Sequence, residues 1–571
     1  MKKEAIYHRM LSEMAAGLDD GTIVFRLRTA RNDAESVTLL FGDRSSRTDP
    51  IPLIESQMEI IGSTKVWDWY EVVLKCPYMR VCYAFKIVDS AGEVAYYYGD
   101  QIEDELPLAR SEYFQIPYNH RADRAQIPSW LPDAIVYNVF PDSFASGRRC
   151  IAGSAEDRYF EGEICRGWRG GTINGIRANL DYIAGMGFNT LYMNPIFAAG
   201  EYHKYDTIDY YHVDPVFGTN DDFRGLVEEC HRRNMHVIID GVFNHAGWHF
   251  MGFKDCIEKG KASRYWSWFH RLEEPVIVPD NWDEYPGYEC FGYERMMPKL
   301  AMDNPETSDY FCNVGSYWVR EFGIDGWRLD VADEVPDVFW RKFRNAVKSV
   351  NPECALIGEV WVNASHWLDG SMFDSVMNYD IWRHGKRFFA EMSIDAEEFD
   401  SRVTDMRTRY RMQHLYGGMN LLDSHDISRF YSLCGESYEK WRLAEVFLFT
   451  FPGMPTVFYG DEKGIPGILE KDFRQAMCWD RPDGQMHFLI SNLASMRTEH
   501  EALRRGTYRT VKTADGFYSY SRETENERII IALNRNNFTV PMECDDIILS
   551  EGLDGDLLSP MGFVIYRENL N

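Results

Sequence analysis

The chain contains 571 residues, of which 45% are hydrophobic and 15% aromatic, and its formal net charge is −28 at pH 7. This length suggests roughly three to four units, or fewer if one of them is a large barrel. The negative charge argues against a nucleic-acid backbone or an anionic membrane as a partner, because both bind to positive patches. No stretch is apolar for long enough to span a bilayer and no signal peptide is recognisable, so we expect a cytoplasmic protein. The 12 cysteines include no C-x-x-C pair, which predicts reduced thiols and no zinc site.

The N-terminal part of the chain, residues 1–122, is predicted to form a small β-sandwich. Apolar or alternating runs at 21–28, 37–41, 67–74 and 80–88 are separated by Asp, Asn, Gly and Pro residues. The polar segment 118–128 is typical of a linker, and the composition changes after it.

The segment 129–495 repeats a strand, a loop and a helix. Predicted strands lie at 134–140, 190–193, 236–239, 326–331, 356–360, 375–377, 419–422 and 456–459. Predicted helices lie at 176–186, 221–233, 308–322, 337–350, 396–409 and 441–451. Eight strands, most of them separated by helices, predict a (β/α)8 TIM barrel.

Two further regions complete the predicted organisation. The stretch 246–304, after the third barrel strand, is too long for a plain βα loop and is rich in aromatic residues, Gly and Pro. It predicts an inserted subdomain over the barrel mouth. Residues 496–571 return to short β runs, which predict a C-terminal β-sandwich. The expected fold is therefore multidomain, with a central barrel between two β-sandwich domains.

Acidic residues follow several of the predicted barrel strands. Arg328 and Asp330 lie two positions apart in GIDGWRLDVAD (323–333), on one face of an otherwise apolar strand, where an isolated pair would more often be structural. Glu359 in IGEVW and Asp426 in LLDSHD occupy similar places, so the three acids are expected to meet at one rim. Cleavage of an acetal with retention needs two carboxyl groups about 5 Å apart. Clustered carboxylates and histidines would also suit a hard metal ion.

The ordered motifs of the chain resemble those of a known family. DGVFNH (240–245), GWRLDVADE (326–334), GEVW (358–361) and LLDSHD (421–426) resemble the characteristic regions of the α-amylase family of retaining glycoside hydrolases. MPKL (297–300) and HKYDTIDYYHVDPVFG (203–218) resemble the neopullulanase, cyclomaltodextrinase and maltogenic amylase subgroup.

This resemblance assigns a role to each of the three acids. Asp330 matches the nucleophile, and Glu359 matches the general acid/base. Asp426 matches the third carboxylate, which grips sugar hydroxyls near the transition state. Arg328 is expected to keep Asp330 ionised through its opposite charge.

Further residues match sugar-binding positions of the family. His245 and His425 match histidines that hydrogen-bond the sugar at the cleavage site, although a lone histidine is more often structural. Tyr205 matches the ring that stacks on the same sugar, and His203 lies beside it in the sequence.

The sequence leaves the roles of three further positions open. Trp361 matches an aromatic residue on the acceptor side, and core packing is an equal alternative. Lys299 could line the substrate groove or be solvated. Asp333 stands where relatives often carry Asn, and no role follows for it.

A calcium site known in the subgroup is not expected here. The loop ASGRRCIAGS (145–154) lacks the Asp and Asn residues that supply oxygen ligands, and GGT (170–172) replaces GGD in its partner loop. Too few hard oxygen atoms remain for calcium. We therefore expect no metal and no required cofactor.

The resemblance implies a hydrolase of α-1,4-glucosidic bonds in cyclodextrins, maltooligosaccharides or pullulan. It also implies that residues 1–122, which are similar to carbohydrate-binding modules, support a homodimer. Two alternatives remain: transglycosylation through the same three acids, and a non-catalytic glucan-binding protein, which the presence of all three acids disfavours.

Overall fold

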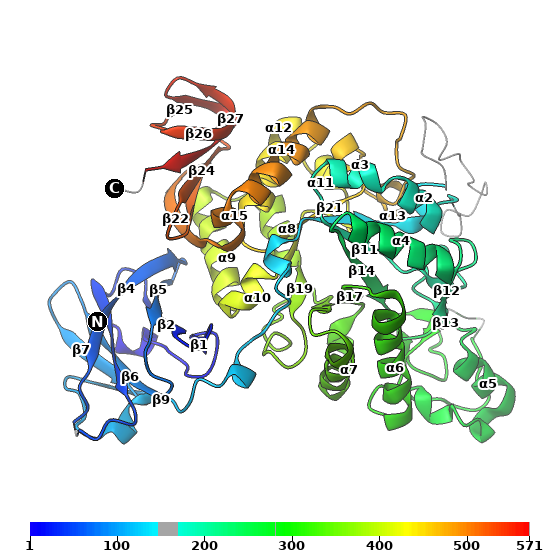
Figure 1. The fold of residues 1–571 in the computed structure, drawn as a ribbon, viewed down its shortest axis with the longest axis horizontal. Coiled ribbons are helices and arrows are strands. Elements are labelled where there is room, and N and C mark those ends of the chain that lie inside the picture. The colour runs from blue at the N-terminus through cyan, green and yellow to red at the C-terminus, as the bar shows by residue number, and fades with distance from the viewer. Residues whose placement is uncertain (49, 147–168, 280, 282, 570–571) are drawn as a thin grey trace. The chain divides into compact units, whose positions relative to one another are not determined.

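The computed structural model describes residues 1–48, 50–146, 169–279, 281 and 283–569. The chain forms two compact units. One comprises Met1–Gln126, Met392–Tyr416 and Arg505–Asn571, and the other comprises Ile127–Glu391 and Gly417–Arg504. Figure 1 shows the elements of both units.

The second unit contains a closed barrel of parallel strands. The strands are β10 (Val136–Val139), β11 (Thr190–Met193), β14 (His236–Gly241), β17 (Gly326–Leu329), β18 (Ala355–Gly358), β19 (Ser375–Asn378), β20 (Met419–Leu421) and β21 (Met454–Phe458). Each strand pairs in parallel with the next, and β10 closes the ring by pairing with β21. Side chains such as Val136, Tyr192, Ile238, Ile357 and Leu421 fill one apolar cluster. The predicted (β/α)8 barrel is therefore confirmed.

Helices follow most of these strands. They include α2 (Ile173–Ala178), α3 (Leu180–Gly185), α4 (Asn220–Arg232), α6 (Pro305–Phe322), α7 (Asp337–Val350), α8 (Tyr379–Gly385), α12 (Tyr438–Thr450) and α14 (Gln485–Glu499). In α6, the Asn304 side chain accepts the backbone N–H groups of Glu306 and Thr307, and Gly323 ends the helix with φ 69°. The segment predicted as one helix at 176–186 is divided into α2 and α3 at Asn179, whose side chain donates to the Gly175 carbonyl. Figure 1 shows α4, α6 and α7 beside β11, β14 and β17.

The predicted insertion lies between β14 and α6. It contains α5 (Met251–Lys259) and a short hairpin of β15 (Cys290–Phe291) and β16 (Glu294–Pro298). The insertion is tied to the barrel through backbone bonds, because Ala246 N–H donates to the Pro298 carbonyl and Leu300 N–H donates to the Asn244 carbonyl. This pairing brings the MPKL segment against the DGVFNH segment.

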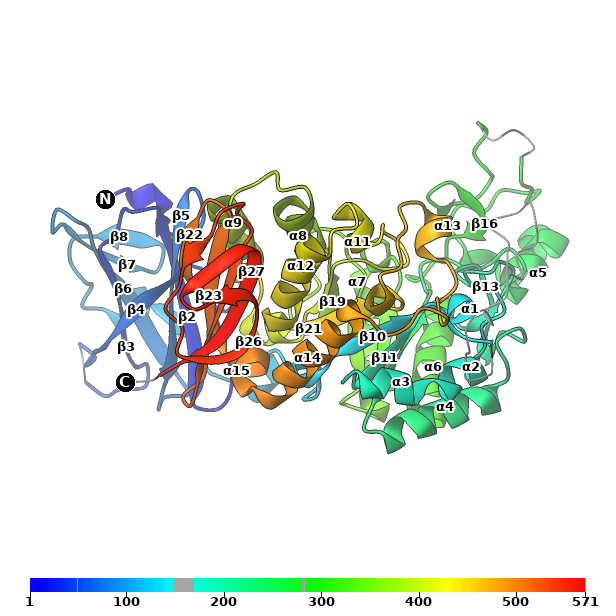
Figure 2. The same cartoon turned by 90° about the horizontal axis from the view of Figure 1, so that it is seen from above.

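The first unit contains two antiparallel sheets. The N-terminal sheet has the order β1-β2-β5-β4-β3-β6-β7-β8, and its long strands are β2 (Thr22–Ala30), β3 (Ser36–Asp43), β4 (Ile54–Ser63), β5 (Trp67–Lys75) and β6 (Val81–Val88). The C-terminal sheet contains β22 (Thr507–Ala514), β23 (Phe517–Glu523), β24 (Arg528–Asn534), β26 (Asp546–Asp554) and β27 (Leu557–Glu568). Figure 2 shows β26 and β27 side by side in red. Each sheet packs its own apolar cluster, so each has a separate core.

The predictions for the cysteines and for membrane-spanning helices can be compared with the described residues. The cysteines in the described ranges are all free thiols. Every helix within those ranges is too short or too polar to cross a lipid bilayer.

Candidate active site

The acidic residues of the site lie at the carboxyl ends of neighbouring barrel strands. Asp330 follows β17, Glu359 follows β18, and Asp240 is close to the end of β14. The position directly before Glu359 is a glycine, Gly358, because a Cβ atom there would lie 2.6 Å from the Phe373 ring. The parallel register therefore brings acids from separate segments to one rim.

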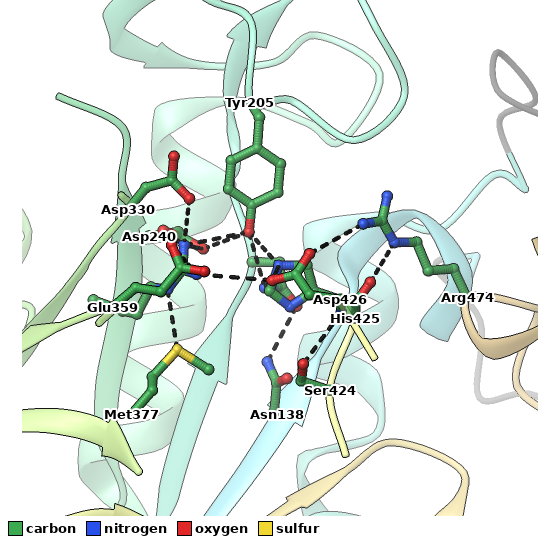
Figure 3. A network of polar contacts seen from close by, with 12 residues as sticks. Asn138, Tyr205, Asp240, Asp330, Glu359, Met377, Ser424, His425, Asp426 and Arg474 are labelled. Atoms are coloured by element: carbon green, nitrogen blue, oxygen red, sulfur yellow. Dashed lines mark hydrogen bonds and ion pairs between the residues drawn. The ribbon is translucent and has the colours of Figure 1, made fainter. Parts of the chain in front are cut away.

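Arg328 connects these acids. Its Nη1 atom lies 2.9 Å from Oδ1 of Asp240 and 2.8 Å from Oδ1 of Asp330. Its Nη2 atom lies 2.9 Å from Oε2 of Glu359 and 3.9 Å from Oδ2 of Asp426. The arginine side chain is fully buried. Figure 3 shows the four acids that it contacts. The pair that sequence alone could have left as a structural ion pair is thus the centre of a four-acid cluster.

The cluster contains four acids around one arginine, so its charges do not balance. The pKa values of Asp330 and Asp426 are shifted as a result. Burial, together with the charges of Glu359, Asp240 and Asp426, raises the pKa of Asp330 well above its ordinary value, although Arg328 acts in the opposite direction. Burial would also raise the pKa of Asp426, but the charges of His425, Arg474 and Arg328 outweigh it and lower that pKa. The cluster therefore holds two aspartates with pKa values shifted in opposite directions, which is typical of catalytic sites.

Glu359 is held on both of its carboxylate oxygen atoms. Oε2 accepts the backbone N–H of Val331 at 2.9 Å in addition to its contact with Arg328. Oε1 accepts the indole N–H of Trp361 at 3.0 Å. The Glu359 side chain is only 7% exposed, so these contacts set the orientation of its carboxyl group.

Tyr205 and His425 lie beside Asp240 and Asp426 of the cluster (Figure 3). The Tyr205 hydroxyl group donates to Oδ2 of Asp240 at 2.9 Å and lies 2.5 Å from Nε2 of His425. The two rings are stacked, with centroids 5.6 Å apart. Asn194 contacts Nδ1 of His425 at 2.9 Å. The predicted Tyr205 and His425 positions are therefore part of one hydrogen-bonded network with Asp240.

The other two predicted histidines lie close to the Tyr205 backbone. His245 is buried and its Nε2 lies 3.2 Å from the Tyr205 carbonyl oxygen, while Nδ1 of His203 accepts the Tyr205 N–H at 3.1 Å. Burial, and then the charge of Lys299, lower the pKa of His245 to about 3. Burial, and then the charge of Arg474, lower the pKa of His203 to about 3. Both imidazoles are therefore neutral near pH 7 and can donate or accept a single hydrogen bond per nitrogen.

The alternatives for Trp361 and Lys299 can now be compared with the structure. Trp361 stacks on Tyr379 with ring centroids 3.9 Å apart, and it remains 37% exposed. The residue is thus packed on one side and accessible on another. Lys299 pairs with Oε2 of Glu334 at 2.9 Å and also donates to the Asn244 side chain, so its amino group is already engaged.

Sequence reasoning missed a second arginine at the site. Arg474 lies in the segment after α13 (Glu470–Phe473) and its Nη2 atom is 3.3 Å from Oδ1 of Asp426. Its Nε atom donates to the His425 carbonyl oxygen at 2.6 Å, and its Nη1 atom contacts Glu470 at 2.6 Å. The only signal in the sequence is the i,i+4 spacing of Glu470 and Arg474, which surface helices share.

The predicted absence of calcium falls partly outside the described residues, because 147–154 of the loop 145–154 are not among them. In the described part, the Asp142 carboxylate accepts the backbone N–H groups of Arg169 and Gly170. Burial raises the pKa of Asp142 to about 6. Among the described residues, no cluster of three or more His, Cys, Asp or Glu side chains could hold a metal ion.

Comparison with known proteins identifies the family. The model of the α-amylase catalytic domain matches residues 138–480, and the model of the α-amylase N-terminal ig-like domain matches residues 1–120. The chain belongs to the α-amylase family.

Several relatives of this α-amylase family member match over almost the whole chain. The cyclomaltodextrinase of Geobacillus thermopakistaniensis (strain MAS1) is 36% identical, and the match covers 99% of each chain. Neopullulanase 2 of Thermoactinomyces vulgaris is 37% identical, covering 94% of this chain and 91% of the relative. A solved cyclomaltodextrinase structure has a TM-score of 0.88 at 32% identity and covers 100% of this chain and 98% of that one. The resemblance to this subgroup is thereby confirmed.

Proposed function

We propose that this chain is a retaining glycoside hydrolase that cleaves α-1,4-glucosidic bonds in cyclodextrins, maltooligosaccharides or pullulan. The observation that carries the proposal is the contact of one guanidinium group, that of Arg328, with both Asp330 and Glu359. Adjacent nitrogen atoms of a planar group hold the two acids close together, as a covalent mechanism with retention requires. Relatives named cyclomaltodextrinase and neopullulanase support the substrate class.

In the first step, a carboxylate oxygen of Asp330 attacks the anomeric carbon of the sugar. The bond to the glycosidic oxygen breaks, and Glu359 donates a proton to that oxygen as it leaves. The product is a glycosyl ester on Asp330. Arg328 favours the ionised form of Asp330, which the attack requires.

In the second step, the Glu359 carboxylate removes a proton from water, and the water oxygen attacks the anomeric carbon. The ester bond breaks, which restores Asp330 as a carboxylate and Glu359 as an acid. Asp426 is ionised and its side chain is 24% exposed, so it can bind sugar hydroxyl groups next to the reacting carbon. His425 contacts the Asp426 carboxylate but is fully buried, so its assignment to the same sugar rests on the family resemblance. The neutral His245 and His203 are assigned to the same sugar.

A second activity, transfer of the glycosyl group to a sugar acceptor, is favoured by the position of Trp361. Its indole ring is partly exposed and is joined to Glu359 by a hydrogen bond, so a sugar stacked on it would lie near the general base. Transfer and hydrolysis share the same intermediate. Time-resolved product analysis of a maltotriose digest separates them, because early products longer than maltotriose arise only by transfer.

The proposed substrate class is tested by comparing kcat/KM on β-cyclodextrin, pullulan, maltotriose and soluble starch. We expect kcat/KM to be higher on β-cyclodextrin, pullulan and maltotriose than on soluble starch. A profile dominated by starch would contradict the proposal. Asp330→Asn serves as the control for contaminating activity and should remove turnover on all four substrates.

We further propose that the protein acts in the cytoplasm as a homodimer, with residues 1–122 of one copy near the active site of the other. The relative from Bacillus subtilis is named an intracellular maltogenic amylase, which supports the location. The proposed domain limits are 1–122, 129–495 with the insertion at about 246–304, and 496–571. Sedimentation equilibrium of the full chain tests the dimer, and a strictly monomeric active enzyme would contradict it.

A further inference from the structure

The backbone turns sharply directly after Asp330. Val331 has φ 45° and ψ 47°, which lie in the left-handed region. Its branched Cβ carbon makes this conformation unfavourable, and Val331 is the single β-branched residue among the described non-glycine residues with positive φ. Its side chain is only half-buried, so tight packing does not explain the turn. Backbone strain of this kind at an active site indicates a functional constraint.

The turn directs two consecutive backbone N–H groups at Glu359. The Val331 N–H donates to Oε2 of Glu359 at 2.9 Å, and the Ala332 N–H donates to the Glu359 carbonyl oxygen at 3.2 Å. In an extended strand, successive residues point to opposite sides, so both groups could not reach one residue. The Ala332 carbonyl accepts the Trp340 indole N–H at 2.8 Å, which anchors the turn to α7.

We propose that Val331 is a positioning residue whose backbone amide fixes the Glu359 carboxyl group for proton transfer. This inference rests on the proposed role of Glu359 as the general acid/base. Oε2 accepts the Val331 N–H and also forms an ion pair with Nη2 of Arg328, whereas Oε1 accepts one N–H, from Trp361. Oε1 therefore keeps a lone pair for the transferred proton. It is the oxygen that protonates the leaving glycosidic oxygen and later removes a proton from water.

The Val331 amide is one of the groups that hold Oε2 of Glu359 in place. A hydrogen bond to a charged oxygen is stronger and more directional than one between neutral groups. Removal of the Val331 N–H should therefore loosen the orientation of the Glu359 carboxyl group.

The test replaces the amide of residue 331 by an ester. The α-hydroxy analogue of valine, introduced by stop-codon suppression, keeps the side chain and removes only the N–H. The matched control is lactic acid at position 332, which removes the neighbouring N–H that faces the Glu359 carbonyl rather than its carboxyl group. Both variants are assayed on maltotriose, which needs a proton donor, and on α-maltosyl fluoride, whose fluoride leaves without one.

We expect the ester at 331 to lower kcat/KM on maltotriose at least ~10-fold, and on α-maltosyl fluoride less than about threefold. The ester at 332 should change the ratio of the two rates less than about twofold. Equal losses on both substrates for the 331 ester would overturn the inference.

Two further variants separate this inference from the proposed function. Glu359→Gln should show the same split between substrates, and more strongly. If Glu359→Gln shows the split and the 331 ester does not, Val331 has no positioning role and the proposed function stands. If Glu359→Gln lowers kcat/KM equally on both substrates, the proposed role of Glu359 is wrong and the inference is wrong with it. Val331→Gly keeps the amide and relieves the strain, so a rate ratio changed more than about threefold would also overturn the inference.

Discussion

Arg474 contacts Asp426 through a side-chain ion pair, with 3.3 Å between Nη2 and Oδ1. The same guanidinium group donates to the carbonyl oxygen of His425, so it fixes both the backbone and the side chain of this loop. Arg474 is 8% exposed, and little solvent screens its charge. It is therefore one cause of the lowered pKa of Asp426, and it links the segment after β21 to the catalytic rim.

Replacement of Arg474 should impair catalysis without removing the three acids. We expect Arg474→Ala to lower kcat/KM on maltotriose by about 10- to 100-fold, because loss of a buried charge partner costs about 1.5–3 kcal/mol. Steady-state kinetics measure the effect. Glu470→Gln is the matched control, since Glu470 contacts Arg474 and not Asp426, and its loss should be below about fivefold. Similar losses in both variants would contradict a direct effect on Asp426.

We expect that a lysine at position 328 cannot take over the role of Arg328. The guanidinium group contacts Asp240 and Asp330 through Nη1 and Glu359 through Nη2, and a single ammonium group cannot reproduce this arrangement. We expect Arg328→Lys to lower kcat at least ~1,000-fold, equivalent to about 4 kcal/mol in the activation free energy. Thermal unfolding, followed by circular dichroism, shows whether the variant is folded. A folded variant that keeps more than about a tenth of the activity would show that positive charge alone is sufficient.

The raised pKa of Asp330 predicts the acidic side of the pH profile. A raised pKa means that Asp330 is still protonated at a pH where an ordinary aspartate is ionised, and the protonated form cannot attack. The acid limb of kcat/KM should therefore lie above the ordinary aspartate value of about 3.9. Asp333→Asn should leave this limb in place, because Asp333 is not among the groups that raise the pKa of Asp330. An acid limb at or below pH ~3.9 would contradict a raised pKa of Asp330.

The loop that carries Tyr205 depends on a buried ion pair. Nζ of Lys204 lies 2.8 Å from Oδ2 of Asp214, and the lysine side chain is fully buried. We expect Lys204→Met to reduce the free energy of unfolding by about 3–5 kcal/mol, because it leaves the buried Asp214 charge without its partner. The double variant Lys204→Met with Asp214→Asn should recover part of this loss. Denaturant unfolding measures both, and additive losses in the double variant would show that the two residues do not interact.

The barrel could be predicted from the sequence because its strands are short apolar runs that end in polar clusters. Strand β4 was not among the predicted strands, since its sequence IESQMEIIGS mixes exposed charged residues with apolar ones and lacks a regular alternation. Helix α14 was also not predicted. Its buried residues Leu489, Ile490, Leu493 and Ala494 have helical spacing, but the exposed Phe488 and the buried Arg497 weaken the contrast between the two faces.

The proposed catalytic acids could be found by motif, but their supporting contacts could not. The strand predicted at 326–331 ends at Leu329, because contacts with Glu359 hold Val331 in a left-handed conformation. Local propensity opposes such a conformation for valine, so only the folded environment reveals it. Arg474 likewise lies 48 residues after Asp426 in the chain and meets it only in the folded barrel.

The measurement that tests the account most directly is the identification of the covalent intermediate. The Glu359→Gln variant is incubated with 5-fluoro-α-maltosyl fluoride, which forms the glycosyl ester quickly and releases it slowly, and the digested protein is analysed by mass spectrometry. We predict a glycosyl adduct on Asp330, in the peptide that contains GWRLDVADE, and no adduct when Asp330→Asn is added. An adduct on Asp426 or another residue, or turnover without any adduct, would contradict the assignment of Asp330 as the nucleophile.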